Sequence, residues 1–130
     1  HKGKVTDLYI NQLADGRLMH SNSWIMPDGW MTDAYMFAVS YPEGTEAADA
    51  KDFFICHGSA LRRDKETYFS SLSKLFVIQK EEGKKLNLWI DGQPKIHATF
   101  RSEKKPTTVI VNGNNFPVVY KNAHVKVKYQ

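Results

Sequence analysis

The sequence predicts a mainly β fold that contains one α-helix, arranged as a small antiparallel barrel packed by a single helix at about residues 65–82. Three observations favour this class. Apolar residues in 65–82 recur at helical spacing, residues 86–91 alternate between apolar and polar, and most of the remaining chain consists of short β-branched or aromatic runs separated by turn sequences. We therefore expect a single domain, 1–130, with its core in 4–92 and a C-terminal β extension in 93–130.

The predicted helix has a start, an apolar face and an end. Asp64 precedes it as an N-cap, because its carboxylate can accept hydrogen bonds from the unpaired N–H groups of the first turn. Gly83 stands where the C′ residue of a helix adopts a left-handed backbone. The apolar residues follow the i, i+3, i+4, i+7, i+8 spacing of one helical face, and we expect them to pack inward. They are Tyr68, Phe69, Leu72, Leu75 and Phe76.

Turn sequences divide the rest of the chain into strands. Asp15-Gly16 and Asp28-Gly29 tolerate the positive φ angles of tight turns, and Asn112-Gly113 between β-branched runs is a strong hairpin signal. The polar segment 42–52 is expected to be a loop. The expected strands, eight or nine in number, are 5–13, 18–26, 31–41, 52–60, 86–91, 95–102, 107–111, 116–120 and 124–129.

Composition excludes some classes of protein. Hydrophobic residues make up 42% and charged residues 25% of the 130 residues, which are ordinary globular values and argue against a disordered chain. The longest apolar runs are too short to span a bilayer. The net charge of +4 permits nucleic acid or an anionic glycan as a partner but demands neither.

The chain begins with His1. One interpretation is that a signal peptide has been removed, which leads us to expect a secreted or periplasmic protein; a cut chain or a tag remnant are the alternatives. An N-terminal His can bind copper, but no second His stands at a ligand spacing from it, so we expect no metal and no cofactor. The single Cys56 cannot form an intrachain disulfide, and its neighbours suggest a small buried residue.

Two side-chain groups are candidates for binding. The first combines methionine, histidine and tryptophan, which we interpret as core or interface, with copper binding as the alternative. The second is aromatic and could stack either on the bases of single-stranded nucleic acid or on the C–H face of a sugar. The first group is Met19, His20, Trp24, Met26, Trp30, Met31 and Met36, and the second is Trp24, Trp30, Tyr35, Trp89 and Tyr120.

No catalytic pattern is evident. The acidic pair Glu81-Glu82 lies among lysines, where solvation is the simplest interpretation, and most other aspartates fall in or near turns. The chain has no nucleophile elbow, no phosphate loop and no HExxH spacing. We therefore expect a protein that is not an enzyme and that has no catalytic residues.

The order of these elements resembles the binding subunits of one-A, five-B bacterial toxins of the pertussis, subtilase-cytotoxin and typhoid-toxin types. The likeness covers residues 4–92. KVTDLYINQLADGR resembles their first strand and turn, FFICHGSA the strand before the helix, and TYFSSLSKLFVIQKEEGKKLNLWID the helix and the strand after it.

This resemblance implies an OB-like fold that assembles as a homopentamer, binds host-cell glycans of the sialoglycan type, and can serve a catalytic A subunit. In the subtilase and typhoid types, a serine at the start of the first strand binds sialic acid. Thr6, followed by Asp7, stands at the matching position and keeps the hydroxyl. The resemblance thus implies a glycan site at Thr6 and Asp7.

The chain departs from those subunits in two ways: they usually carry a disulfide, and they end sooner, so that residues 93–130 have no counterpart. The alternative function is a small OB-like domain that binds single-stranded nucleic acid or a protein. Lysines are spread along the chain and do not form one stripe, which disfavours nucleic acid.

Overall fold

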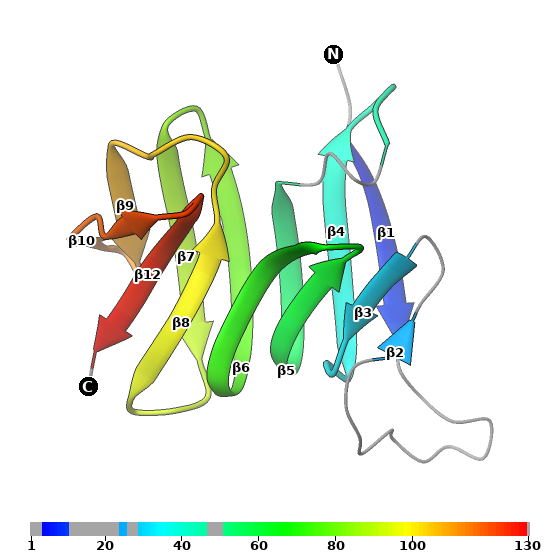
Figure 1. The fold of residues 1–130 in the computed structure, drawn as a ribbon, viewed down its shortest axis with the longest axis horizontal. Helices are drawn as coiled ribbons and strands as arrows, with labels where there is room; N and C mark the ends of the chain where they lie inside the picture. The colour runs from blue at the N-terminus through cyan, green and yellow to red at the C-terminus, as the bar shows by residue number, and fades with distance from the viewer. Residues whose placement is uncertain (1–3, 11–23, 26–28, 47–50, 130) are drawn as a thin grey trace.

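Over the residues that the structure describes, twelve strands form one sheet that curls like half of a barrel (Figure 1). The computed structural model describes residues 4–10, 24–25, 29–46 and 51–129. The mainly β class is confirmed, and within the described residues no α-helix occurs. The strands are β1 (Lys4–Ile10), β2 (Trp24–Ile25), β3 (Trp30–Thr32), β4 (Met36–Pro42), β5 (Asp52–Arg63), β6 (Glu66–Glu82), β7 (Lys85–Asp91), β8 (Ile96–Arg101), β9 (Thr108–Val111), β10 (Asn114–Phe116), β11 (Tyr120–Lys121) and β12 (His124–Tyr129).

The helix predicted at 65–82 is wrong, because these residues form the long strand β6. β6 pairs with β5 along one edge and with β8 and β7 along the other. Asp64, expected as an N-cap, has a φ of 53° in the two-residue turn before β6, and Gly83, expected at C′, has a φ of 61° in the β6–β7 turn. The expected inward face is therefore split: Tyr68, Phe69 and Leu75 are buried, whereas Leu72 and Phe76 are exposed.

β5 and β6 bend, and each contributes to two halves of the sheet. The first half of β5 pairs with β4 and the second half with β3, while β6 pairs first with β8 and then with β7. The halves meet through Phe69, whose ring centroid lies 6.2 Å from that of Phe53 and 5.4 Å from that of Phe100. Burial of such aromatic rings is a major favourable contribution to folding.

The bend in β5 is a β-bulge at Gly58. The register with β6 shifts on both sides of this residue, and His57 has a φ of 57°. Asp33, in the segment between β3 and β4, accepts hydrogen bonds from the backbone N–H groups of Ser59 (2.7 Å) and Ala60 (3.1 Å), and from the Ser59 hydroxyl. Because a bulge takes backbone groups out of the ladder, the carboxylate supplies the acceptor that they would otherwise lack.

The predicted N-terminal strands are found in part. The strand expected at 5–13 is β1 as far as Ile10, and the one expected at 18–26 is described only as β2. The strand expected at 31–41 is interrupted by residues 33–35, which separate β3 from β4. Residues 11–23, with the predicted turn at Asp15-Gly16, lie outside the described part of the chain, as do residues 47–50 of the predicted loop.

The strands of 93–130 join the same sheet. β8 pairs with β6, β12 pairs with β8, and β9 pairs with β7 in parallel. The hairpin predicted at Asn112-Gly113 is confirmed: these two residues connect β9 to β10 with φ angles of 51° and 85°. The Asn112 side chain accepts from the Ile90 N–H (2.8 Å) and donates to the Ile90 carbonyl (3.0 Å), so that it extends the β7–β9 ladder by one position.

The core lies between the two halves of the sheet. Its largest fully buried side chains come from six consecutive strands, β3 to β8. Positions that alternate with them along each strand face outward, as the pleat of a β-strand requires. The largest of the fully buried side chains are Trp30, Phe37, Ile55, Leu61, Phe69, Leu75, Leu86, Leu88, Ile96 and Phe100.

Candidate functional site

The outward face of β4 to β7 carries a row of apolar residues. Ala38, Phe54, Ile78 and Trp89 are successive ladder partners across these four strands. Each of them is flanked along its own strand by buried residues, so the alternation of the strands places them on the face away from the core. The row therefore crosses the sheet on its outer surface.

Aromatic rings dominate this row. Phe76 packs against Phe54 with ring centroids 5.1 Å apart and an interplanar angle of 70°, an edge-to-face arrangement that aromatic pairs prefer. Phe76 is 40% exposed and Trp89 is 48% exposed. Single exposed apolar residues are common, but a contiguous exposed aromatic surface marks a place where something binds.

A hollow of about 330 Å³ lies on this face, with polar groups beside the apolar row. Ser40 is the ladder partner of Asp52, and Lys80 follows the Phe53–Gln79 pair on β6. The Asp52 carboxylate is held by a hydrogen bond from the Glu81 N–H (2.9 Å). We call this hollow the outer trough; it is lined by Ala38, Ser40, Asp52, Phe53, Phe54, Ile78, Gln79 and Lys80.

The expected glycan-site residues lie in the edge strand next to the outer trough. In β1, Thr6 is the ladder partner of Ser40, a residue that lines the trough, and Asp7 is the partner of Val39, a core residue. The side chains of β1 are not among those that the structure describes. The register thus places Thr6 beside Ser40 in the ladder.

Most other candidates from the sequence have structural roles. Trp30 is fully buried, with the Arg63 guanidinium 5.8 Å from its ring centroid. The Tyr120 hydroxyl donates to the carbonyls of Ser102 (2.7 Å) and Glu103 (3.1 Å). Cys56 is half-buried. Of the aromatic residues proposed for stacking, Trp89 has the exposure that stacking requires, and Trp24 has no described side chain.

A second hollow, of about 410 Å³, opens over β6, β8 and β12 and contains His124. Both ring nitrogens of His124 contact backbone carbonyls, Nδ1 with Asn122 (2.7 Å) and Nε2 with Thr67 (2.9 Å). A histidine that acts as a general base needs a nitrogen free to reach its substrate. The imidazole instead ties the β11–β12 turn to the start of β6.

In the part of the chain that the structure describes, no group of three or more His, Cys, Asp or Glu side chains is placed to hold a metal ion. No helix among the described residues is long and apolar enough to cross a membrane. No protein-family model matches this chain. A search of curated proteins likewise finds no match. The function is therefore argued from the surface chemistry alone.

The outer trough could have been found in part from the sequence. The run from Phe76 to Lys80 alternates between exposed and buried residues, and Trp89 lies in a strand that was predicted correctly as 86–91. The helical interpretation of β6 assigned Phe76 to the core and so removed it from the surface. Without that interpretation, Phe76 and Ile78 would have been expected on the outer face.

Proposed function

We propose that this domain is a non-enzymatic glycan-binding module and that the outer trough is its binding site. The observation that carries the proposal is the pairing of an aromatic row, Phe54 to Trp89, with the polar groups of Ser40, Asp52 and Lys80 along its side. A sugar ring offers apolar C–H groups on its face and hydroxyls around its edge. Binding sites of this kind combine an apolar floor with a few polar groups that fix the orientation of the ligand.

Carboxylate and ammonium groups suit sugar hydroxyls in complementary ways. The Asp52 carboxylate accepts hydrogen bonds from hydroxyls, and the Lys80 ammonium donates to them. Thr6 is next to Ser40 in the ladder, and we expect its hydroxyl to contribute to ligand binding. A sialoglycan is the finer form of this proposal, with Thr6 and Asp7 as the residues that contact the sialic acid.

Single-stranded nucleic acid is the alternative ligand. Proteins that bind it combine stacking rings with a positively charged groove that follows the backbone. The outer trough carries one lysine, Lys80, and one aspartate, Asp52, so its charges balance. This balance favours a sugar over a polyanion at this face.

The toxin-type assembly is part of the proposal. Three features implied by the toxin resemblance stay predictions. They are a secreted or periplasmic location, assembly as a homopentamer with a catalytic A subunit, and closure of the sheet into an OB-like barrel. The segment matched to the helix and following strand of those subunits forms the β6–β7 hairpin here. The proposal therefore relies on the outer trough and not on that match.

A glycan array followed by calorimetry tests the function. Phe76→Ala and Trp89→Ala should each weaken the binding of a glycan hit about tenfold, which corresponds to ~1.4 kcal/mol. Phe76 and Trp89 flank the trough, since Phe76 packs against Phe54 and Trp89 is the ladder partner of Ile78, and both of these partners line it. Leu72→Ala is the matched control, because Leu72 is an exposed apolar residue of the same strand as Phe76 and belongs neither to the apolar row nor to the trough lining. Thr6→Val tests the expected contact at β1.

Three outcomes decide between the alternatives. The proposal is supported if Phe76→Ala and Trp89→Ala weaken glycan binding and Leu72→Ala leaves it intact. A silent array together with tight binding of single-stranded DNA, whose affinity falls steeply with added salt through counterion release, overturns it in favour of nucleic acid. Silence in both assays also overturns it and indicates a protein-interaction role. Light scattering tests the pentamer, and a monomer of about 15 kDa contradicts it.

A further inference from the structure

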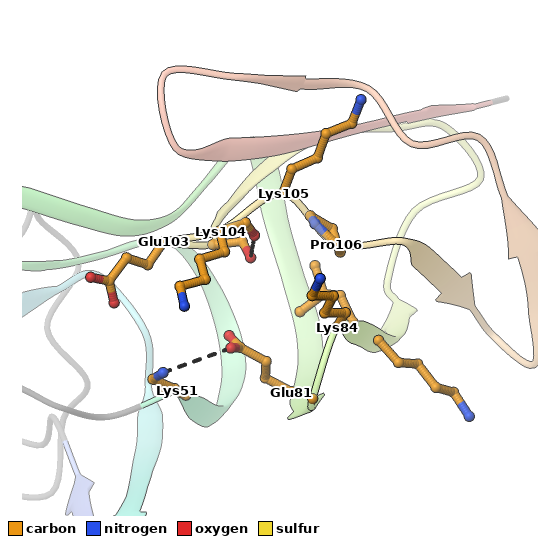
Figure 2. A pocket seen from close by; sticks show the side chains of 11 residues that line it. Lys51, Glu81, Lys84, Glu103, Lys104, Lys105 and Pro106 are labelled. Carbon is orange, nitrogen blue, oxygen red and sulfur yellow. Dashed lines mark hydrogen bonds and ion pairs between the residues drawn. The ribbon is translucent and has the colours of Figure 1, made fainter.

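A lysine-lined pocket of about 290 Å³ lies at one end of the half-barrel (Figure 2). Its walls come from the end of β6, the β6–β7 turn, the segment from β8 to β9, and Lys51 before β5. Side chains alternate between the two faces of β6. Glu81 lies on the same face as the buried Val77 and Gln79, whereas Lys80 lies on the other face and lines the outer trough. The side chains of Lys80 and Glu81 therefore leave β6 on opposite faces, and the inward-facing Phe53 and Gln79 also border the trough.

The charge of the pocket is strongly positive. Five lysines and two glutamates line it, which leaves three positive charges in excess, while the whole chain has a net charge of +4. The lysines are Lys51, Lys84, Lys85, Lys104 and Lys105. Figure 2 shows that the Lys104 side chain extends toward the Lys51–Glu81 pair and that Lys105 extends away from it.

Glu81 neutralises only a small part of this charge. Its carboxylate lies 3.9 Å from Lys51 Nζ, at the long end of ion-pair distances, and the Lys51 side chain is largely exposed. Among the described residues, no ion pair is formed by Lys84 or Lys104. Ammonium groups gathered around one hollow repel each other, and a bound anion would relieve that repulsion.

The backbone around the pocket is held in place without a ligand. The Lys84 carbonyl accepts from the Thr107 N–H (2.8 Å), which ties the β6–β7 turn to the segment before β9. The Ser102 N–H donates to the Ala123 carbonyl (2.8 Å), and the Ser102 hydroxyl donates to the Lys104 carbonyl (2.8 Å). A preformed site loses less conformational entropy on binding than a loop that must first become ordered.

We propose that this pocket binds a small tetrahedral oxyanion with three terminal oxygens: a phosphate or sulfate ester on a molecule of about the size of one or two sugar rings. Lys51, Lys84 and Lys104 contact the oxyanion as point charges, since ammonium groups pair with phosphate and sulfate oxygens without a fixed geometry. Glu81 accepts a hydroxyl of the same ligand. The site is separate from the outer trough and does not depend on the function proposed for it.

Calorimetry at constant ionic strength tests the pocket. The probes are inorganic phosphate, inorganic sulfate, glucose 6-phosphate and N-acetylglucosamine 6-sulfate, with N-acetylneuraminic acid as a planar carboxylate of the same charge as the sulfate ester. The pocket variant is Lys84→Gln with Lys104→Gln. The control is Lys95→Gln with Lys128→Gln, which removes the same charge from two exposed lysines that do not line this pocket.

We expect the pocket variant to lose about tenfold or more in affinity for an ester probe and the control to change by less than about twofold. The better of the two ester probes identifies the source of the oxyanion. Equal losses of affinity in the two variants would show a general charge effect and overturn the proposal. The absence of binding by every phosphate and sulfate probe at millimolar concentration would also overturn it. Tighter binding of N-acetylneuraminic acid than of either ester would overturn the oxyanion assignment. Trp89→Ala should leave anion binding unchanged, which separates failure here from failure of the glycan proposal.

Discussion

A β-carbon added to Gly58 would lie 2.7 Å from the Cβ of Ala34. Gly58 sits at the bulge of β5, and Ala34 belongs to the segment that separates β3 from β4. The same β-carbon would lie 2.9 Å from Ile55 Cγ2. Glycine is thus required at this position by close approach, and the bend of β5 depends on it.

Gly58→Ala should therefore destabilise the protein. Forcing an extra methyl group into a packed site typically costs about 1–3 kcal/mol. Urea unfolding followed by tryptophan fluorescence measures the loss. Ala34→Gly in the same chain should recover only part of it, because the nearest clash is removed while those with the Ala34 Cα and with Ile55 Cγ2, each at 2.9 Å, stay. A Gly58→Ala protein of unchanged stability would contradict the close approach.

The carboxylate of Asp33 should be important for the same bulge. Asp33→Ala leaves the N–H groups of Ser59 and Ala60 without their acceptor, and an unsatisfied buried donor costs about 1–3 kcal/mol. Asp33→Asn keeps one oxygen acceptor and should lose less than alanine. Denaturant unfolding of the three proteins gives the order. Equal losses for Asn and Ala would show that the carbonyl oxygen alone does not support the bulge.

Leucines 72 and 75 distinguish strand from helix in β6. Leu75 is 1% exposed and Leu72 is 82% exposed. Leu75→Ala should cost about 2–5 kcal/mol, because it removes buried methyl groups and leaves a cavity. Leu72→Ala should stay within about 0.5 kcal/mol of the parent protein, as surface changes do. A large loss for Leu72→Ala would restore the amphipathic helix.

Glu81 should make both stability and anion binding depend on pH. Burial raises the pKa of Glu81 above its ordinary value of 4.5, with Asp52 and Glu103 adding to the rise and Lys51 and Arg101 opposing it. The native state then holds this proton more tightly than the unfolded state does. The resulting stability is fully present below pH 4.5 and is lost as the pH rises through the raised native pKa.

Sulfate is the probe for this effect, because its charge is constant over that range. Its affinity should fall as the pH rises through the Glu81 pKa, since the deprotonated carboxylate competes for Lys51. Glu81→Gln should bind sulfate more tightly than the parent protein at neutral pH and should lose this part of the pH dependence. Parallel pH profiles for the two proteins would exclude Glu81 as the titrating group.

The sequence predicted the hairpin at Asn112-Gly113, whose turn chemistry is unambiguous. Asn112-Gly113 can satisfy two consecutive positive φ angles, and the structure places it in such a turn. Gly83 illustrates the opposite case, because a glycine with positive φ serves equally at a helix C′ position and at the first position of a two-residue hairpin turn. Local chemistry alone could not decide between them.

The error at β6 has a physical cause. In a regular strand, buried residues recur every second position, but four residues of β6 lie between the partners of Gly58 and Ala60, where β5 has one. The register shifts again between Leu61 and Arg62, next to the point where the adjacent Tyr68 and Phe69 are both buried. The exposed Leu72 and Phe76 then fall at helical spacing from Tyr68 and Phe69. The resulting spacing imitates a helical face. Only the pairing with β5, β7 and β8, which is not local in sequence, reveals the strand.

The two opposite faces of β6 have a consequence for valency. Lys80 belongs to the outer trough and Glu81 to the lysine-lined pocket, so consecutive residues of one strand, whose side chains leave it on opposite faces, serve two different sites. Neither ligand would block the other, and a sugar on one side and an ester on the other could be held at once. A protein that engages a surface bearing both groups would then gain avidity from a single chain, before any assembly with further copies.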